Sequence, residues 1–222
     1  MTTAILIPAR LNATRLPRKM LCPLNGVPLI QRVYDRCVET GLDTYVLADS
    51  EEVMALFGDR AIMTDYRLAN GTDRCMSVID EVLHYDRYIN VQGDMPDITP
   101  EIIRAVEGAL QHSDVATAYT PMDFNLRNDP NSVKMIHSRG RAHWFLRASL
   151  EYGDHHLGVY GYNRESKIVY STSTKFPEED IEKLEQLRWI QNGQKIGVVE
   201  VEFDGIEINS PEDVVKWHKQ NA

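Results

Sequence analysis

The sequence predicts an α/β fold with a mainly parallel central sheet and helices on both of its faces. Short apolar runs that are typical of buried strands alternate, through the first half of the chain, with segments whose apolar residues recur at helical spacing. Strand, helix and strand follow one another at short intervals, which is the pattern of β-α-β units. Because the strands of such units run in the same direction, the sheet is expected to be mainly parallel.

The first half of the chain gives the clearest elements. Residues 3–8 form an unbroken apolar run, so we expect a strand that is buried on both faces. Apolar side chains in residues 28–39 lie at helical spacing, and Gly41 supplies a stop. Further strands are expected at 44–48, 61–63, 88–91 and 115–119, and further helices from Glu51 onward, at 72–83 and at 100–110.

The second half is less regular. We expect a hairpin with strands at 132–137 and 142–146, because Arg139-Gly140 offers a turn between them. Residues 211–219 predict a final helix, with Ser210 as N-cap and Pro211 at its first position. No flexible linker interrupts the chain, which predicts one domain over residues 1–222. The remaining expected elements are one long helix at 177–192 and strands at 156–162 and 195–201.

Composition excludes several classes of protein. The 24 basic and 33 acidic side chains give a formal net charge of −9, which argues against a nucleic-acid-binding surface. No apolar run approaches the roughly 20 residues of a membrane helix, and the N-terminus lacks the pattern of a signal peptide. Three widely spaced cysteines follow no metal-binding pattern and are typical of reduced thiols. We therefore expect a cytoplasmic protein that binds neither nucleic acid nor membrane.

A basic loop follows the first predicted strand. Residues 9–19 read Ala-Arg-Leu-Asn-Ala-Thr-Arg-Leu-Pro-Arg-Lys and hold four cations. In an open parallel sheet, ligands bind beyond the carboxyl ends of the strands, where this loop must lie. Arginines can bind phosphate oxygens through two hydrogen bonds, and Lys19 can place a point charge on a leaving pyrophosphate. The loop matches neither the dinucleotide-binding nor the P-loop pattern, and the alternative interpretation is a solvated basic loop.

An aspartate follows the strand that is expected at 88–91. In Gln92-Gly93-Asp94 the carboxylate lies just past the strand end, where it can hold Mg²⁺ against nucleotide phosphates. Gly-Asp is also an ordinary turn sequence, so the two residues alone do not decide between a metal site and a turn. Their combination with the basic loop favours the metal site.

A third motif, Asn70-Gly71-Thr72-Asp73-Arg74, opens a predicted helix. Its first backbone amides can bind a polar group of a base or a sugar, because the amides at a helix N-terminus point outward without partners. Thr72 is also an ordinary N-cap residue, so the motif is open to a purely structural interpretation.

Histidines precede and enter the strand expected at 156–162. His155 and His156 are adjacent and point to opposite faces of a strand, so they are not expected to share a metal ion. His156, Tyr160 and Tyr162 lie on one face and can form a hydrogen-bonding wall for a sugar. The alternative is that His156 is a structural histidine.

These motifs together resemble the family of 3-deoxy-manno-octulosonate (Kdo) cytidylyltransferases, also called CMP-Kdo synthetases. The resemblance begins with Ile7-Pro8-Ala9-Arg10, Thr14-Arg15-Leu16-Pro17 and Lys19, and it continues with residues 90–94. Further matching segments follow in family order over nearly the whole chain, at 71–74, 129–134, 156–162, 184–188 and 210–213.

The resemblance implies a three-layer, Rossmann-like nucleotidyltransferase fold, with a small sugar-side and dimerisation subdomain at roughly 130–195. It implies transfer of CMP from CTP to the anomeric hydroxyl of Kdo, release of pyrophosphate, Mg²⁺ as the cofactor and a homodimer. By resemblance, the catalytic residues are Arg15, Lys19 and Asp94, and the nucleotide-binding residues are Ala9, Arg10, Arg15, Lys19, Gly71, Thr72 and Arg74. The implied sugar-binding residues are Gln92, His156, Tyr160, Glu185 and Gln186, and the implied metal ligands are Asp94 and Asn209.

Three departures from the family pattern concern the site. Asn209 stands where the family usually has a metal-binding aspartate, and Glu207, expected on the same strand face, would partly replace its charge. Met95 stands where the family has an acid, and the sugar-side loop after residues 145–148 is shortened. These differences suggest a weaker metal site and a different acidic sugar, such as an amino-substituted Kdo.

Two alternatives stay open. A nucleotidyltransferase that uses a sugar 1-phosphate would rely on the same chemistry, but segments 156–162 and 184–188 favour the Kdo-type sugar. A non-catalytic nucleotide or sugar binder is suggested by Asn209 and Met95, and it would bind CTP without turnover.

Overall fold

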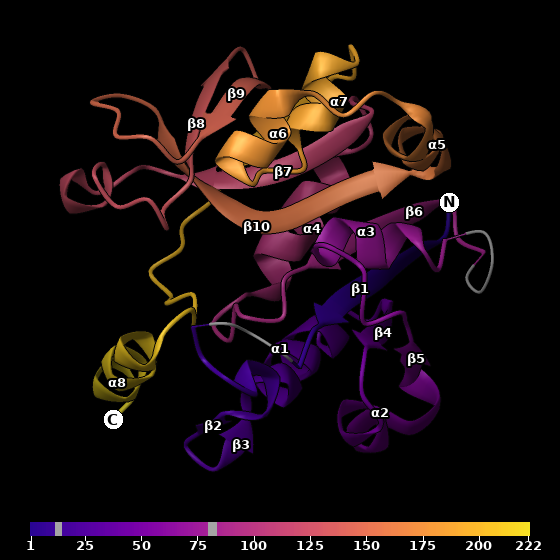
Figure 1. Cartoon of the computed structure of the whole chain (residues 1–222), viewed down its shortest axis with the longest axis vertical. Helices are drawn as coiled ribbons and strands as arrows, with labels where there is room; N and C mark the ends of the chain where they lie inside the picture. The colour runs from indigo at the N-terminus through magenta and orange to yellow at the C-terminus, as the bar shows by residue number, and fades with distance from the viewer. Residues whose placement is uncertain (12–14, 80–83) are drawn as a thin grey trace. The chain divides into compact units, whose positions relative to one another are not determined.

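The computed structural model describes residues 1–11, 15–79 and 84–222. The chain forms two compact units, the first made of Met1–Ile103 and Asp204–Ala222 and the second of Arg104–Phe203. Figure 1 shows the helices and strands of both. Thr14 of the basic loop, and residues 80–83 at the end of the helix predicted over 72–83, lie outside the described residues.

The first unit is built on parallel strands. In sheet order these are β5 (Ala61–Met63), β4 (Asp43–Ala48), β1 (Thr3–Ala9) and β6 (Arg87–Val91). Each pairing among them is parallel. Ile5, Leu6 and Ile7 have no exposed surface, because β1 is paired on both edges and covered on both faces. This double cover explains the unbroken apolar run that predicted the strand.

Helices surround these strands. They are α1 (Leu29–Val38), α2 (Glu51–Phe57), α3 (Gly71–Met76) and α8 (Pro211–Gln220), while α4 (Pro100–Ala109) contains the boundary between the units. The helix expected at 72–83 is wrong in length, because α3 ends at Met76. The amide of Val78 donates to the carbonyl of Cys75 at 3.2 Å, which tightens the chain into a turn there. The smaller elements are η1 (Lys19–Leu21), β2 (Pro23–Leu24), β3 (Val27–Pro28) and η2 (Gly58–Arg60).

The second unit has a mixed sheet. Its strands, in order, are β10 (Asp154–Asn163), β7 (Val115–Thr120), β11 (Ile196–Glu200), β9 (Arg141–Leu146) and β8 (Lys134–Ser138). Only β11 and β7 are parallel, so the mainly parallel arrangement holds for the first unit and not for this one. The predicted hairpin is confirmed, and Arg139 and Gly140 between β8 and β9 both have positive φ, at 51° and 71°.

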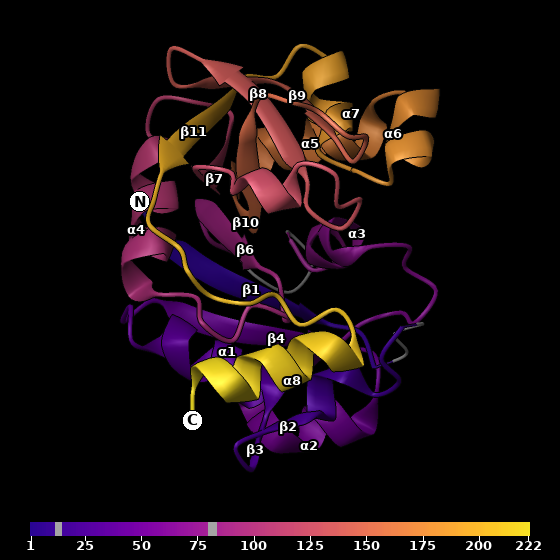
Figure 2. The same ribbon diagram turned by 90° about the vertical axis from the view of Figure 1, so that its left-hand side faces the viewer.

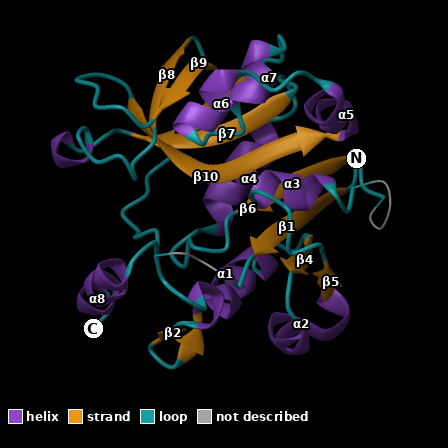
Figure 3. Cartoon of the chain, in the orientation of Figure 1, coloured by secondary structure: helices purple, strands orange, loops and turns teal. Residues whose placement is uncertain are grey.

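The second unit also shows where helix prediction fails. The expected helix at 177–192 is wrong, since the chain forms α6 (Pro177–Glu182) and α7 (Leu187–Gln191) instead. Lys183 ends α6 in the left-handed conformation, with φ 55° and ψ 48°. The remaining elements are α5 (Arg164–Thr172), which the sequence did not predict, and η3 (Phe124–Leu126). Figure 3 separates the helices from the strands, and no helix in the described parts of the chain is long and apolar enough to cross a bilayer.

The final helix begins with a complete capping box. The hydroxyl of Ser210 accepts from the amide of Asp213 at 3.4 Å, and the Asp213 carboxylate accepts from the amide of Ser210 at 2.8 Å. Pro211 occupies the first turn, as predicted. Figure 2 shows α8 beside β2, which it contacts within the first unit.

We expect Ser210→Ala to lower the free energy of unfolding by about 1 kcal/mol, because the backbone amide of Asp213 at the start of α8 loses the hydroxyl that caps it. Urea denaturation measures the change. Ser171→Ala is the matched control, since Ser171 is an exposed residue inside α5, where alanine favours the helix. Equal stability of Ser210→Ala and wild type would contradict the role of the cap.

Candidate active site

A pocket lies at the carboxyl ends of β1 and β6 in the first unit. Its volume is about 220 Å³. The sequence placed the basic loop and the Gly93-Asp94 turn at this edge of the sheet, and both contribute to the pocket. The residues that line it are Pro8, Arg10, Lys19, Met20, Asn70, Gly71, Arg74, Gln92, Gly93 and Asp94.

Lys19 and Asp94 meet at the wall of this pocket. The Lys19 ammonium lies 2.7 Å from Asp94 Oδ2, and the two side chains are 11% and 22% exposed. The Asn209 Oδ1 atom accepts from Lys19 at 3.4 Å and from Arg15 at 3.3 Å. Three segments that are far apart in the sequence therefore bring together two cations, Arg15 and Lys19, and the side-chain oxygens of Asp94 and Asn209.

Close packing positions Asp94. A Cβ atom on Gly93 would lie 2.9 Å from the carbonyl oxygen of Pro8 and 3.0 Å from the sulfur of Met20. Any side chain at this position would push the turn after β6 away from β1. Glycine is thus needed before Asp94 because of the close approach to β1.

The segment that carries Asn209 is held by individual hydrogen bonds to the turn after β6 and not by pairing with a strand. The amide of Ile208 donates to the Asp94 carbonyl at 2.9 Å, and the amide of Ile206 donates to Asp97 Oδ2 at 3.0 Å. Residues 201–209 have no regular secondary structure, so the expectation that Glu207 and Asn209 share a strand face is wrong. The backbone amides of Ile206 and Ile208 find partners in the turn after β6 in place of a neighbouring strand.

Asp97 is a positioning residue that the sequence did not single out. Besides holding Ile206, its Oδ1 atom accepts from the indole nitrogen of Trp217 at 2.8 Å. It therefore ties α8 and the preceding segment to the turn that carries Asp94. An acid shortly after Asp94 is the only signal in the sequence, and nothing local identifies partners so far along the chain.

The side-chain oxygens that surround the Lys19 ammonium are suitable ligands for a magnesium ion. Asp94 Oδ2 and Asn209 Oδ1 both point at one cation, which shows that they can share a positively charged ligand. Among the described residues no group of three His, Cys, Asp or Glu side chains can hold a metal. Mg²⁺ takes one or two carboxylates together with phosphate oxygens and water, so this small donor set fits a metal that arrives with a nucleotide.

The start of α3 forms another side of the pocket. Asn70 is the N-cap, because its Oδ1 atom accepts from the amide of Asp73 at 2.7 Å, and the expectation that Thr72 caps this helix is wrong. Thr72 is instead buried in the first turn. A Cβ atom on Gly71 would lie 2.9 Å from both terminal atoms of the Gln92 side chain, so glycine leaves room for that side chain beside the start of the helix.

Arg74 lines the pocket from a buried position. Its guanidinium is 1% exposed and donates to the Thr64 hydroxyl and, at 3.5 Å, to Asp49 Oδ2. Arg10 also lines the pocket and is exposed, whereas Ala9 is fully buried at the end of β1.

Gln92 also lines the pocket, and its amide nitrogen donates to Asn90 Oδ1 at 3.2 Å. Both side chains come from β6 or the residue that follows it. The sequence resemblance assigned Gln92 to the sugar, and the structure places it beside the residues expected to bind the nucleotide.

The other expected sugar-binding residues belong to the second unit. His156 on β10 is 5% exposed, and its Nε2 atom lies 3.0 Å from the Thr117 hydroxyl. That hydroxyl donates to the Val159 carbonyl at 2.7 Å, so its oxygen accepts from the Nε2 hydrogen of a neutral imidazole. Tyr160 packs against His156, with ring centroids 5.2 Å apart. Burial, then the nearby His155 and Arg147, lowers the pKa of His156 to about 3.

The turn between α6 and α7 carries Glu185 and Gln186. Gln186 is 1% exposed, and its amide nitrogen has no hydrogen-bond partner among the described residues. Glu185 is half-buried. An unpaired buried amide is costly, so the Gln186 nitrogen is a donor whose burial is not compensated within the described residues.

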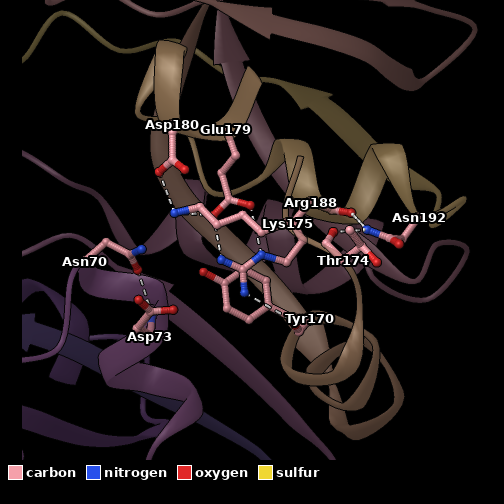
Figure 4. A network of polar contacts seen from close by, with 9 residues as sticks. All are labelled: Asn70, Asp73, Tyr170, Thr174, Lys175, Glu179, Asp180, Arg188 and Asn192. Atoms are coloured by element: carbon pink, nitrogen blue, oxygen red, sulfur yellow. Dashed lines mark hydrogen bonds and ion pairs between the residues drawn. The ribbon is translucent and has the colours of Figure 1, made fainter. Parts of the chain in front are cut away.

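A buried ion pair fixes this turn. Arg188 on α7 donates to both oxygens of Glu179 on α6, at 2.9 and 2.5 Å, and its guanidinium lies 3.9 Å over the ring of Tyr170. Figure 4 shows these side chains, with Lys175 paired to Asp180 beside them. Because a straight helix would not bring Arg188 back to Glu179 in this way, the ion pair accounts for the break that the sequence did not predict.

Known proteins resemble this chain over nearly its whole length. The Cytidylyltransferase family model matches residues 4–196. The chain is 39% identical to the 3-deoxy-manno-octulosonate cytidylyltransferase of a Nitratiruptor species, over 96% of this chain and 97% of that protein. It is 35% identical to the 8-amino-3,8-dideoxy-manno-octulosonate cytidylyltransferase of Shewanella baltica, over 100% and 99% of the two chains.

Solved structures give the same result. A CMP:2-keto-3-deoxy-manno-octonic acid synthetase complexed with CTP matches with a TM-score of 0.91 and 32% identity, over 100% of this chain and 98% of that one. The inositol-1-phosphate CTP transferase of T. maritima matches with a TM-score of 0.72 at 14% identity, over 100% and 98%, which is a likeness of fold alone. The chain belongs to the cytidylyltransferase family, and the nucleotidyltransferase fold and the family resemblance predicted from the sequence are confirmed.

The neutral state of His156 predicts a pH-dependent stability. Its pKa is about 3 in the folded chain and about 6.5 in the unfolded chain, so the unfolded state binds more protons between these values. The free energy of unfolding should therefore fall as the pH decreases from about 6.5, by at most about 1.4 kcal/mol per pH unit from this group. Urea denaturation from pH 7 to pH 4 measures the slope.

The matched variants are His156→Gln, which removes the buried imidazole, and His112→Gln, which removes an exposed one. We expect His156→Gln to flatten the slope and His112→Gln to leave it unchanged. The same slope in all three proteins would show that His156 does not carry the effect.

Proposed function

We propose that this chain transfers CMP from CTP to the anomeric hydroxyl of Kdo or a closely related acidic sugar and releases pyrophosphate. The observation that carries the proposal is that Lys19 and Asp94 meet at the pocket of the first unit and that Asn209 accepts a hydrogen bond from the same Lys19 ammonium. The relatives named as Kdo and amino-Kdo cytidylyltransferases support the choice of nucleotide and sugar.

In the proposed reaction the sugar hydroxyl attacks the α-phosphorus of CTP directly, without a covalent enzyme intermediate. Arg10, Arg15 and Lys19 bind the triphosphate, and Lys19 balances the charge that grows on the departing pyrophosphate. Its 11% exposure strengthens this effect, because a charge acts more strongly where water is excluded. Alignment of the attacking and leaving groups is the other contribution of the protein.

We propose Mg²⁺ as the cofactor, held by Asp94 and Asn209 together with the phosphates of CTP. When bound, it would neutralise the phosphate charge and orient the triphosphate. Asn209 supplies a neutral oxygen, so Asp94 carries the protein's negative charge at this place. Glu207 is half-buried on the same irregular segment, and we retain it as a further candidate ligand.

The sugar is proposed to contact Gln92, His156, Tyr160, Glu185 and Gln186. Gln186 has the strongest physical support, because its buried amide nitrogen lacks a partner among the described side chains. Whether the sugar is Kdo or its 8-amino analogue is decided by a direct comparison of the two substrates.

The alternative of a non-catalytic binder rests on Asn209 and Met95. Met95 has no exposed surface and packs in the core, so the missing acid at this position takes no ligand away from the pocket. Asn209 keeps an oxygen directed at Lys19, which also favours an active enzyme over a binder. The other alternative, a nucleotidyltransferase that uses a sugar 1-phosphate, is tested by the comparison of substrates described below.

We also propose that the protein is a single-domain cytoplasmic enzyme, that it works as a homodimer, and that its product supplies a surface glycan or lipopolysaccharide. Light scattering of the purified chain tests the dimer. A mass corresponding to one chain of 25.4 kDa would reject it.

The experiment that tests the activity is pyrophosphate release with Mg²⁺, in which CTP is compared with ATP, GTP and UTP. Each nucleotide is combined with Kdo, 8-amino-Kdo, sialic acid, a sugar 1-phosphate or no sugar. Release only with CTP and a Kdo-type sugar supports the proposal. CTP binding without release from any sugar would establish the binder instead.

Asp94→Ala should lower kcat by about a hundredfold or more, since the carboxylate that balances Lys19 and holds the metal is removed. Circular dichroism checks that the fold is retained. Asp59→Ala is the control, because Asp59 is an exposed acid of the same unit outside the pocket. Wild-type turnover of Asp94→Ala at saturating Mg²⁺ would reject the metal assignment.

Lys19→Ala should slow the chemical step and weaken CTP binding, while the KM for the sugar stays unchanged. The reason is that Lys19 acts on the phosphates and the leaving group. Single-turnover pyrophosphate release and steady-state KM values separate these effects. A variant that changed only the sugar KM would contradict this role.

A further inference from the structure

Asp49 occupies a position from which it holds two parts of the nucleotide pocket. It directly follows β4, and its side chain is 5% exposed. Its Oδ1 atom accepts from the amide of Leu11 at 2.9 Å, and its Oδ2 atom accepts from Arg74 at 3.5 Å. Leu11 follows Arg10 at the start of the basic loop. One carboxylate therefore connects that loop to the buried arginine of α3.

Arg74 needs this carboxylate because it is charged and buried. Burial lowers the pKa of Arg74, and the positive charge of Arg10 acts in the same direction. Asp49 opposes both effects. The hydroxyl of Thr64 is a second partner of the guanidinium among the described residues, and it in turn donates to the Ala48 carbonyl at 2.7 Å. The wall of the pocket thus carries a cation, Arg74, whose charge is balanced by a residue that does not itself line the pocket.

Asp49 does not line the pocket as the described residues form it. Its effect on a ligand must therefore pass through Leu11 and Arg74. A hydrogen bond to the Leu11 amide fixes the direction in which the chain leaves Arg10, and the ion pair keeps two neighbouring arginines close together despite their repulsion.

We propose that Asp49 is a positioning residue for the CTP triphosphate, which sets the start of the basic loop and keeps Arg74 at the pocket wall. The proposal rests on the proposed function, since it takes the pocket to be the CTP site. It adds to the reaction a residue that contacts neither substrate.

The test is Asp49→Asn, which keeps an oxygen for the Leu11 amide and removes the charge beside Arg74. Calorimetry with CTP alone gives the Kd, and pyrophosphate release gives the KM for CTP and for the sugar. We expect the CTP Kd to rise about tenfold or more, because a charge-assisted bond is lost, while the sugar KM stays unchanged. A purely structural role would lower the melting temperature and leave the CTP Kd of the folded protein unchanged, which would overturn the proposal.

Two further variants sharpen the test. Asp49→Glu keeps the charge but moves the carboxylate by one methylene, and it should bind CTP less tightly than wild type and more tightly than Asp49→Asn. If Asp49→Asn does not fold, wild-type CTP affinity of Asp49→Glu would overturn the proposal. Asp43→Asn is the control, since Asp43 is an exposed acid at the other end of β4 and pairs with Arg60 at 2.9 Å. It should bind CTP as wild type does.

The wild-type protein separates the two hypotheses. If it binds no CTP and releases no pyrophosphate, both the proposed function and the role of Asp49 are rejected. If it binds and turns over CTP, and Asp49→Asn does so with the same Kd, only the role of Asp49 is rejected.

Discussion

The ion pair between Lys19 and Asp94 joins the loop after β1 to the turn after β6, and the rest of the pocket is arranged around it. Both side chains are mostly buried, so each charge depends on the other, and loss of one partner would leave a buried charge without compensation. Gly93 permits the approach, because any side chain there would collide with the Pro8 carbonyl. The Asp94 carbonyl also holds Ile208, and through it the segment of Asn209.

The same physical problem, the balance of charge in a partly buried site, recurs at two other places. Asp49 balances Arg74 at the pocket wall, while Glu179 balances Arg188 in the second unit. In each case an acid that faces away from solvent holds a cation in a defined position. Such pairs contribute little net stability, since the desolvation of both charges offsets their attraction, but they specify geometry. A phosphate-transfer enzyme requires this kind of geometric control.

Much of the site could be predicted from the sequence. The apolar run of β1, the cations that follow it, and Asp94 after β6 are local features, and parallel strands bring their carboxyl-end loops to one edge of a sheet. The motifs also match those of a known family in the same order along the chain, and this match predicted the family. Local features also gave the capping box of α8 and the hairpin around Arg139 and Gly140, since caps and turns depend on neighbouring residues.

Tertiary structure decided the features that depend on partners far along the chain. Trp217 and Asp97 are 120 residues apart, and no local pattern indicates that one will hold the other. The irregular course of residues 201–209 has the same origin, whereas the break between α6 and α7 depends on the ion pair between Arg188 and Glu179, which are 9 residues apart. At each of these places a specific tertiary hydrogen bond or ion pair outweighs the local preference of a few tenths of a kcal/mol per residue. The sequence by itself thus determined the fold class and the chemistry available at one sheet edge, and the folded chain decided which side chains hold that chemistry in place.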